Sequence, residues 1–183
     1  LQSFCSEELG GFYLDILKDR LYTTAAGSQA RRSAQNALYH ITQSLTRLMA
    51  PILSFTGEEV WALLSSKQDV SVFEELWYAL PDAAMDSAAL NAWAEIRNVR
   101  ELANKKLEEQ RAAGVIGSAL AAEVDVYAEG AAYESLKRLG ADLKFVFITS
   151  RVTLHQREGG AVEIKVAASG HAKCERCWHY QED

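Results

Sequence analysis

The sequence has little cysteine and proline, and it lacks any long apolar run. Its 183 residues include three cysteines and two prolines. Because a sparse, odd cysteine count does not build a disulfide framework, the pair Cys174 and Cys177 indicates metal or redox chemistry in a reducing compartment. No run approaches the ~20 apolar residues that span a bilayer, and the N-terminal residues lack the basic start of a signal peptide. We therefore expect a cytoplasmic protein with no membrane partner.

Signatures of catalysis are also missing. The sequence contains no glycine-rich phosphate loop after a strand pattern, no G-x-S-x-G and no H-E-x-x-H. The adjacent acids Glu58 and Glu59 do not face one site on a helix. We expect no catalytic residue in this chain. Because it begins with Leu1 and not with methionine, we also expect it to be a piece of a longer protein.

The net charge of −6 argues against a nucleic-acid binder that is held by its overall charge. One segment differs from the rest, because residues 18–47 contain five basic side chains and one acidic side chain. The basic residues are Lys18, Arg20, Arg31, Arg32 and Arg47. An acidic protein with one basic helical region can bind a phosphate backbone locally.

The first 117 residues are predicted to be mainly helical, because apolar residues recur there at helical spacing. We predict helices over 7–22, over 28–50 with Ser28 as N-cap, and over 86–111. A capping box of Thr56 and Glu59 is predicted to open a further short helix.

One face of the predicted helix over 28–50 carries charge, hydrogen-bonding groups and an aromatic ring on one line. Its residues are Arg32, Asn36, Tyr39, Gln43 and Arg47. This combination suits RNA, because phosphates take arginine and unstacked bases take tyrosine or arginine planes. A plain solvated helix face remains the alternative.

The pattern changes after Gly117 to short alternating segments. "AEVDVYA" and "AVEIKVA" alternate as strands do, while "KFVFITS" and "RVTLHQ" predict one strand pair or one bent strand. We therefore expect three parts: a helical domain over 1–117, a small α+β module over 118–168, and half of a zinc knuckle over 169–183.

The last part contains "GHAKCERCWHY". Two thiolates from C-x-x-C can hold one zinc ion at ~2.3 Å, but a structural site needs four ligands. No second pair follows, and only His171 and His179 are at hand to complete a strained set. A redox pair is the alternative; it favours a helix N-terminus that lowers a thiol pKa, and no helix pattern follows Cys177. We favour a truncated zinc knuckle.

Four segments of the sequence match the motifs of one known family. "GGFYLDILKDRLYT" and "RRSAQNALYHITQSLTRLMAPILSFTGEEVW" resemble the anticodon-binding region of bacterial isoleucyl-tRNA synthetases. "VRELANKKLEEQRAAGVIGSALAAEVDVYA" resembles its later linker helix and first strand, and "KCERCWHY" resembles its C-terminal zinc knuckle. The resemblance covers essentially the whole chain.

The resemblance implies a class I ligase that uses ATP and Mg²⁺ to attach isoleucine to its tRNA. The catalytic and editing domains of the family lie upstream of these motifs, so this piece is expected to be inactive alone. It is expected to bind isoleucine tRNA, not DNA, as a monomer. The rival classes are a helical protein-interaction module, which would expose an apolar patch, and a zinc-ribbon DNA binder, which would bind duplex DNA.

The resemblance also assigns roles to residues. It implies a tRNA-facing surface that includes Lys18, Arg20, Arg31, Arg32, Tyr39 and Arg47. Cys174 and Cys177 match the first pair of a four-cysteine zinc site in the family, and the second pair has no counterpart here. Trp178, which follows them, is a candidate platform on which a flipped base stacks.

Overall fold

The computed structural model describes residues 1–65, 70–82 and 86–182. By compactness the chain forms two units. Unit one comprises residues 1–19 and 85–183, and unit two comprises residues 20–84. The expected helix-rich first part and small α+β module are confirmed, whereas the division at 117 and 168 stays a prediction. Within the described ranges, no helix is both long and apolar enough to cross a bilayer.

The described part of unit two includes two long helices and a short turn. Helix α2 spans Gln29–Met49, α3 spans Ser54–Leu64, and a 3-10 turn spans Val72–Glu74. Ser28 caps α2 as predicted, because its hydroxyl accepts a hydrogen bond from the backbone N–H of Arg31 at 3.2 Å.

The capping box predicted for α3 is wrong. The helix begins at Ser54, Leu53 occupies the cap position, and no side chain caps it. Thr56 and Glu59 therefore lie inside the helix. The preceding turn starts α3 instead, since the N–H of Gly57 already donates to the carbonyl of Leu53 at 2.7 Å.

A close contact between α3 and the end of α2 holds unit two together. A Cβ added at the buried Gly57 would lie 3.0 Å from the Cβ of Ala50, so only glycine permits this approach. Trp61 and Val72 complete the small core around Ala50. The indole N–H of Trp61 also donates to the carbonyl of Val70 at 2.9 Å, which joins α3 to the segment that follows it.

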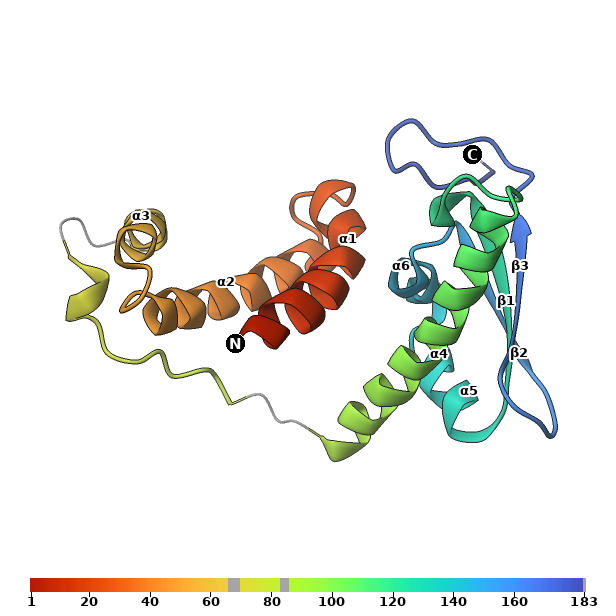
Figure 1. Cartoon of the computed structure of the whole chain (residues 1–183), viewed down its shortest axis with the longest axis horizontal. Coiled ribbons are helices and arrows are strands. Elements are labelled where there is room, and N and C mark those ends of the chain that lie inside the picture. Colours follow the sequence, from red (N-terminus) through yellow and green to blue (C-terminus); the bar gives the residue numbers. More distant parts are fainter. Residues whose placement is uncertain (66–69, 83–85, 183) are drawn as a thin grey trace. The chain divides into compact units, whose positions relative to one another are not determined.

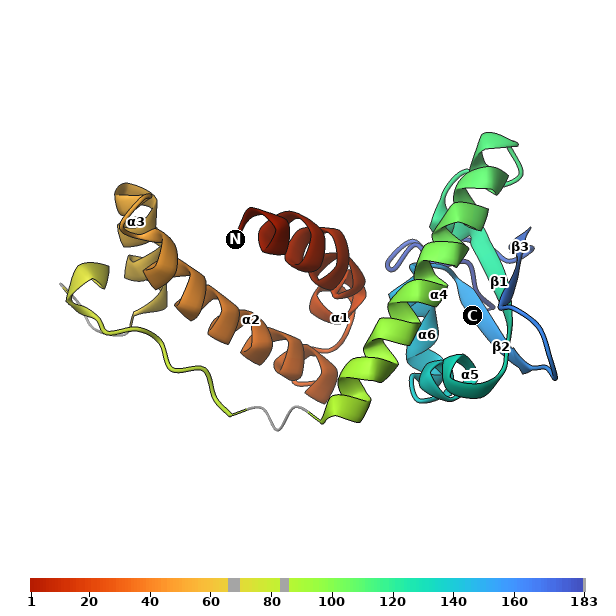
Figure 2. The same cartoon turned by 60° about the horizontal axis from the view of Figure 1, so that its bottom comes forward.

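Unit one contains a three-stranded sheet that is covered on one face. Strands β1 (Ala122–Ala128), β2 (Arg151–Gln156) and β3 (Glu163–Ala168) lie in the order β2-β1-β3. Strand β1 pairs with β2 in parallel and with β3 antiparallel. Figures 1 and 2 show helices α4 (Ser87–Ala112), α5 (Gly130–Lys137) and α6 (Leu143–Phe147) on the same side of the sheet.

The core of unit one lies between α4 and β1. Alternate residues of β1 are buried, as its sequence alternation predicted. The buried side of α4 is made by residues at helical spacing, namely Ile96, Val99, Ala103 and Leu107. These residues join those of β1 in one apolar cluster, to which α5, α6 and β3 contribute Leu136, Phe147 and Ile164.

The strand predicted for "KFVFITS" is wrong, because most of this segment forms α6. Leu143, Val146 and Phe147 are buried on it at positions i, i+3 and i+4. A short apolar run is compatible with either structure, and burial against α4 and the sheet favours the helix here. The strand predicted for "RVTLHQ" is confirmed as β2.

The N-terminal segment packs on α4. The helix predicted over 7–22 is divided into a π-helix over Phe4–Leu14 and α1 over Lys18–Tyr22. The Arg97 guanidinium donates to both carboxylate oxygens of Glu8, at 2.5 and 3.2 Å. Phe12 meets the ring of Trp93 edge-on, with centroids 6.1 Å apart. These contacts explain why residues 1–19 belong to the same compact unit as α4.

We predict that Gly57→Leu destabilises the chain by about 1–3 kcal/mol, because the added atoms force α3 away from Ala50. Urea unfolding followed by circular dichroism measures the change. The matched control is Ala62→Leu on the exposed side of α3, which should change stability by less than about 0.5 kcal/mol. Equal effects of the two substitutions would contradict the close contact.

A pH dependence is expected from the Glu8–Arg97 pair. The hydrogen bond from Arg97 holds the pKa of Glu8 below its usual value. The pair therefore contributes stability above the pKa of the unfolded chain, about 4.3, and this contribution is lost as the pH falls through the lower folded pKa. Unfolding midpoints are measured between about pH 3 and 7. As the pH falls, the stability of Glu8→Gln should decrease less steeply than that of the parent chain. Identical slopes would rule the contribution out.

Candidate nucleic-acid interface

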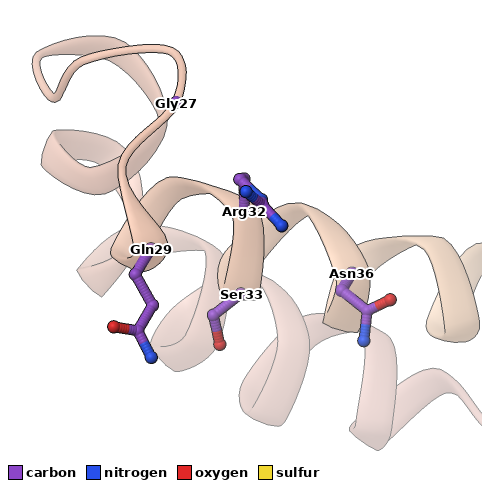
Figure 3. A pocket seen from close by; sticks show the side chains of 5 residues that line it. All are labelled: Gly27, Gln29, Arg32, Ser33 and Asn36. Carbon is purple, nitrogen blue, oxygen red and sulfur yellow. The ribbon is translucent and has the colours of Figure 1, made fainter.

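A pocket follows the first two turns of α2 (Figure 3). It is lined by Gly27, Gln29, Arg32, Ser33 and Asn36 and has a volume of about 630 Å³. The four helical residues are spaced by three, four and seven positions, which places them along one side of the helix. Figure 3 shows the Gln29, Ser33 and Asn36 side chains extending to that side, with Arg32 at its edge. The pocket therefore presents polar groups and one positive charge.

The neighbouring arginines Arg31 and Arg32 are used differently. Arg31 is half-buried, and its guanidinium donates to the carbonyl of Thr24 at 3.3 Å. Arg32 is exposed, and no partner for its guanidinium occurs among the residues that the structure describes. Only Arg32 of this pair thus presents a free positive charge to a ligand.

Tyr39 continues the polar side of α2 beyond the pocket. It lies two turns after Arg32, and 47% of its surface is exposed. Its ring meets that of His40 edge-on, with centroids 5.5 Å apart. The His40 ring is in turn 2.5 Å from the hydroxyl of Tyr78, measured from Nδ1. This packing holds the Tyr39 ring beside a fixed neighbour and leaves its surface available for stacking.

Arg47 has a packing role. Its guanidinium lies 4.4 Å from the ring centroid of Trp61 and 5.3 Å from that of Tyr78, within the range of cation–π contacts. It donates to the Gln43 carbonyl at 3.0 Å and lies 3.6 Å from the Glu75 carboxylate. Since only 10% of the side chain is exposed, little of it is left for an RNA phosphate. Arg47 is therefore less available to a ligand than the exposed Arg32.

Lys18 and Arg20 lie on α1. The Lys18 ammonium pairs with the Asp15 carboxylate at 2.6 Å and remains largely exposed. Arg20 is half-buried and has interactions of its own. The contact of both residues with tRNA stays a prediction.

The cysteines lie in a tight turn of the tail. A β-bridge between Lys173 and Tyr180 closes this turn. Inside it, the Cys174 N–H donates to the His179 carbonyl at 2.8 Å, and the Trp178 N–H donates to the Cys174 carbonyl at 3.0 Å. The turn thus brings the two cysteines of the C-x-x-C pair to one end of a small loop.

The surroundings of Cys177 argue against the redox alternative. Burial raises the pKa of its thiol, and the neighbouring Cys174 and the charge of Asp19 raise the pKa further. A redox cysteine needs the opposite shift, because the thiolate is the reactive form.

The described residues do not make a complete zinc site. Across residues 1–65, 70–82 and 86–182, no cluster of three or more histidine, cysteine, aspartate or glutamate residues is arranged to hold a metal ion. Cys174 and Cys177 thus offer two of the four ligands that tetrahedral zinc requires. The two candidate histidines make other contacts, since His171 lies 3.6 Å from Glu123 and His179 lies 3.1 Å from Asp19.

Trp178 is held outward by the turn. Its φ of +66° is in the left-handed region, which costs a non-glycine residue about 1–3 kcal/mol. The ring is 59% exposed, and the Lys173 ammonium lies 5.1 Å from its centroid. An exposed ring beside a cation suits the stacking of a base next to a phosphate.

His179 is the anchor of the tail. Its side chain is almost completely buried, at 2% exposure. Its Nε2 atom lies 3.1 Å from the Asp19 carboxylate, 160 positions earlier in the sequence, and its ring meets Phe145 edge-on at 5.8 Å. The sequence had offered His179 only as a strained metal ligand, because nothing local signals a partner so far along the chain.

The sequence family described as "Anticodon-binding domain of tRNA ligase" matches residues 1–126. The chain therefore belongs to this family. The matched residues include all of α2, with its pocket and its exposed polar side as far as Tyr39.

Over its whole length the chain is also similar to bacterial isoleucine–tRNA ligases. It is 56% identical to the isoleucine–tRNA ligase of Bordetella pertussis, of which it spans 20%, and 56% identical to that of Burkholderia multivorans, of which it spans 19%. The chain thus spans about a fifth of the length of these relatives. The similarity includes the cysteine-containing tail, which lies beyond the matched family domain.

We predict that His179→Ala releases the tail. Losing the buried hydrogen bond should cost about 1–3 kcal/mol, so trypsin should cleave after Lys173 and Arg176 roughly 10- to 100-fold faster. Mass spectrometry of timed digests measures the two sites. His155→Ala on the sheet, where the histidine is only half-buried, is the matched control and should leave these rates nearly unchanged. Unchanged cleavage in His179→Ala would show that the tail is held by other contacts.

Proposed function

We propose that the chain is the anticodon-binding part of an isoleucine–tRNA ligase and that it holds the anticodon arm of isoleucine tRNA. Family membership and whole-chain similarity to isoleucine–tRNA ligases support this role. The observation that carries it is the exposed side of α2 between Gln29 and Tyr39, where the Arg32 guanidinium has no partner among the described residues. This side lies within the region that matches the family.

Binding would combine phosphate contacts with base stacking. Arg32 and Lys18 are exposed cations that can contact phosphates, which position an RNA without reading its sequence. Tyr39 and Trp178 are exposed rings on which unpaired bases can stack, at about 1–3 kcal/mol per base. Because the chain carries a net charge of −6, attraction to RNA has to come from these local groups and should weaken steeply with salt.

The chemical step would take place elsewhere in the longer protein. ATP, Mg²⁺ and the activation of isoleucine belong to its catalytic domain, and we assign no catalytic residue to this chain. Holding the anticodon arm would position the acceptor end of the tRNA at that distant site, in a cytoplasmic and monomeric enzyme. This division of labour uses binding energy from a non-reacting part of the substrate.

We further propose that Cys174 and Cys177 supply the first half of a four-cysteine zinc knuckle. The turn that brings the two thiols to one end of a small loop suits a pair of neighbouring ligands of one ion. The other two ligands are not among the described residues, so no step of the proposed function depends on the ion.

A protein-interaction role is the second candidate, because unit two exposes several large apolar side chains. Among the described residues of unit two, those at least 73% exposed are Tyr22, Ile52, Phe55, Leu63, Leu76 and Trp77. Apolar exposure on this scale marks contacts with other protein surfaces. Such contacts are compatible with tRNA binding on α2, which uses a different set of side chains.

The proposed function predicts selective RNA binding. In fluorescence anisotropy at two salt concentrations, an isoleucine tRNA anticodon stem-loop should bind more tightly than a stem-loop of another tRNA or duplex DNA. The double variant Arg32→Ala, Trp178→Ala should weaken this binding at least about tenfold, as the loss of one phosphate contact and one stack requires. Arg138→Ala, which removes another exposed arginine, is the control. Equal affinity for duplex DNA, or no loss in the double variant, would contradict the assignment.

A further inference from the structure

The pocket on α2 carries more hydrogen-bonding groups than a contact with one phosphate requires. Among the residues that the structure describes, Arg32 is the only charged one that lines it. The other polar side chains are two amides, Gln29 and Asn36, and the hydroxyl of Ser33. A side-chain amide carries both donors and acceptors, which matches the edge of a nucleobase better than an all-acceptor phosphate.

We infer that this pocket holds one unpaired nucleotide of the anticodon loop and that Gln29 and Asn36 recognise its base. The inference rests on the proposed function and extends it from RNA binding to sequence reading. Arg32 contacts the adjoining phosphate. Ser33 lies between the amides, where its hydroxyl can bond the ribose 2′-OH that distinguishes RNA from DNA.

The dimensions of the pocket suit a nucleotide. Gln29 and Asn36 are seven residues apart, so their backbones are separated by about 10 Å along the helix axis. Arg32 and Ser33 lie at intermediate heights on the same side. The volume of about 630 Å³ lies within the range of about 300–1,000 Å³ that small-ligand pockets occupy.

The loop before α2 leaves room beside the pocket. Gly27 lines the pocket, and a Cβ added there would have no atom within 4 Å, so the backbone of the loop faces open space at this point. Beyond the pocket, Tyr39 lies one turn after Asn36 and exposes its ring. A base in the pocket would therefore have a stacking surface for its neighbour next to it, which favours a continuous strand over an isolated small molecule.

The test is a double-mutant cycle between protein and RNA. The complete 183-residue chain is titrated with the anticodon stem-loop and with a series in which each loop nucleotide in turn lacks its base. Asn36→Ala and Gln29→Ala should each weaken binding of the intact stem-loop about tenfold, since paired amide contacts to a base edge are worth that much. Against one abasic stem-loop of the series this loss should disappear, because the base that the amides contact is gone.

Two variants serve as comparisons. Gln35→Ala removes an exposed amide from α2 that does not line the pocket, so binding should stay within about twofold of the parent chain. Arg32→Ala should weaken binding of every stem-loop alike and should lower the salt slope by about one. Circular dichroism and thermal unfolding establish that each variant is folded.

The inference is overturned if Asn36→Ala and Gln29→Ala behave like Gln35→Ala while the parent chain binds the stem-loop. It is also overturned if their losses persist against every abasic stem-loop, if a DNA stem-loop is bound and weakened equally, or if free nucleoside monophosphates bind as tightly as the stem-loop. In these cases the proposed function survives whenever the parent chain still prefers the isoleucine stem-loop. If the parent chain does not bind this stem-loop, the proposed function fails together with the inference.

Discussion

Unit one depends on the packing of α4 across β1. The buried residues Val99 and Ala103 on the helix meet the alternate buried positions of the strand in one apolar cluster. This packing fixes the sheet, and the sheet then holds the tail. The Ser169 hydroxyl donates to Glu123 on β1 at 2.7 Å, and the Tyr180 N–H donates to Ser150 just before β2 at 2.5 Å. The turn that contains the cysteines is thus attached to a strand whose other face is the core.

Unit two is held together by a small apolar core. The contact of Gly57 with Ala50 brings α3 against α2, and the Trp61 ring that it buries supports the Arg47 guanidinium. Because this cluster lies at the C-terminal end of α2, the first turns of the helix keep their polar side free. The two ends of α2 therefore have different roles. Its C-terminal end packs around Arg47, and its first part, from Gln29 to Tyr39, exposes the polar groups that are proposed to bind RNA.

The arginines of α2 show why a basic stripe in a sequence does not identify ligand contacts. Arg31, Arg32 and Arg47 have the same charge and occur on the same helix, yet their guanidinium groups contact a loop carbonyl, the pocket and two aromatic rings, respectively. The free energy of a guanidinium–phosphate contact is available only where that group is not already paired or stacked.

The sequence by itself determined the helices α2 and α4, the cap at Ser28 and the alternation of β1, because these depend on local spacing and on neighbouring side chains. It also identified the family, since the motifs that carry it are contiguous. Tertiary structure alone decided that "KFVF" forms a helix and that Arg47 is packed inward. It alone joined His179 to Asp19, because that pair depends on a contact across 160 residues, which no local pattern encodes.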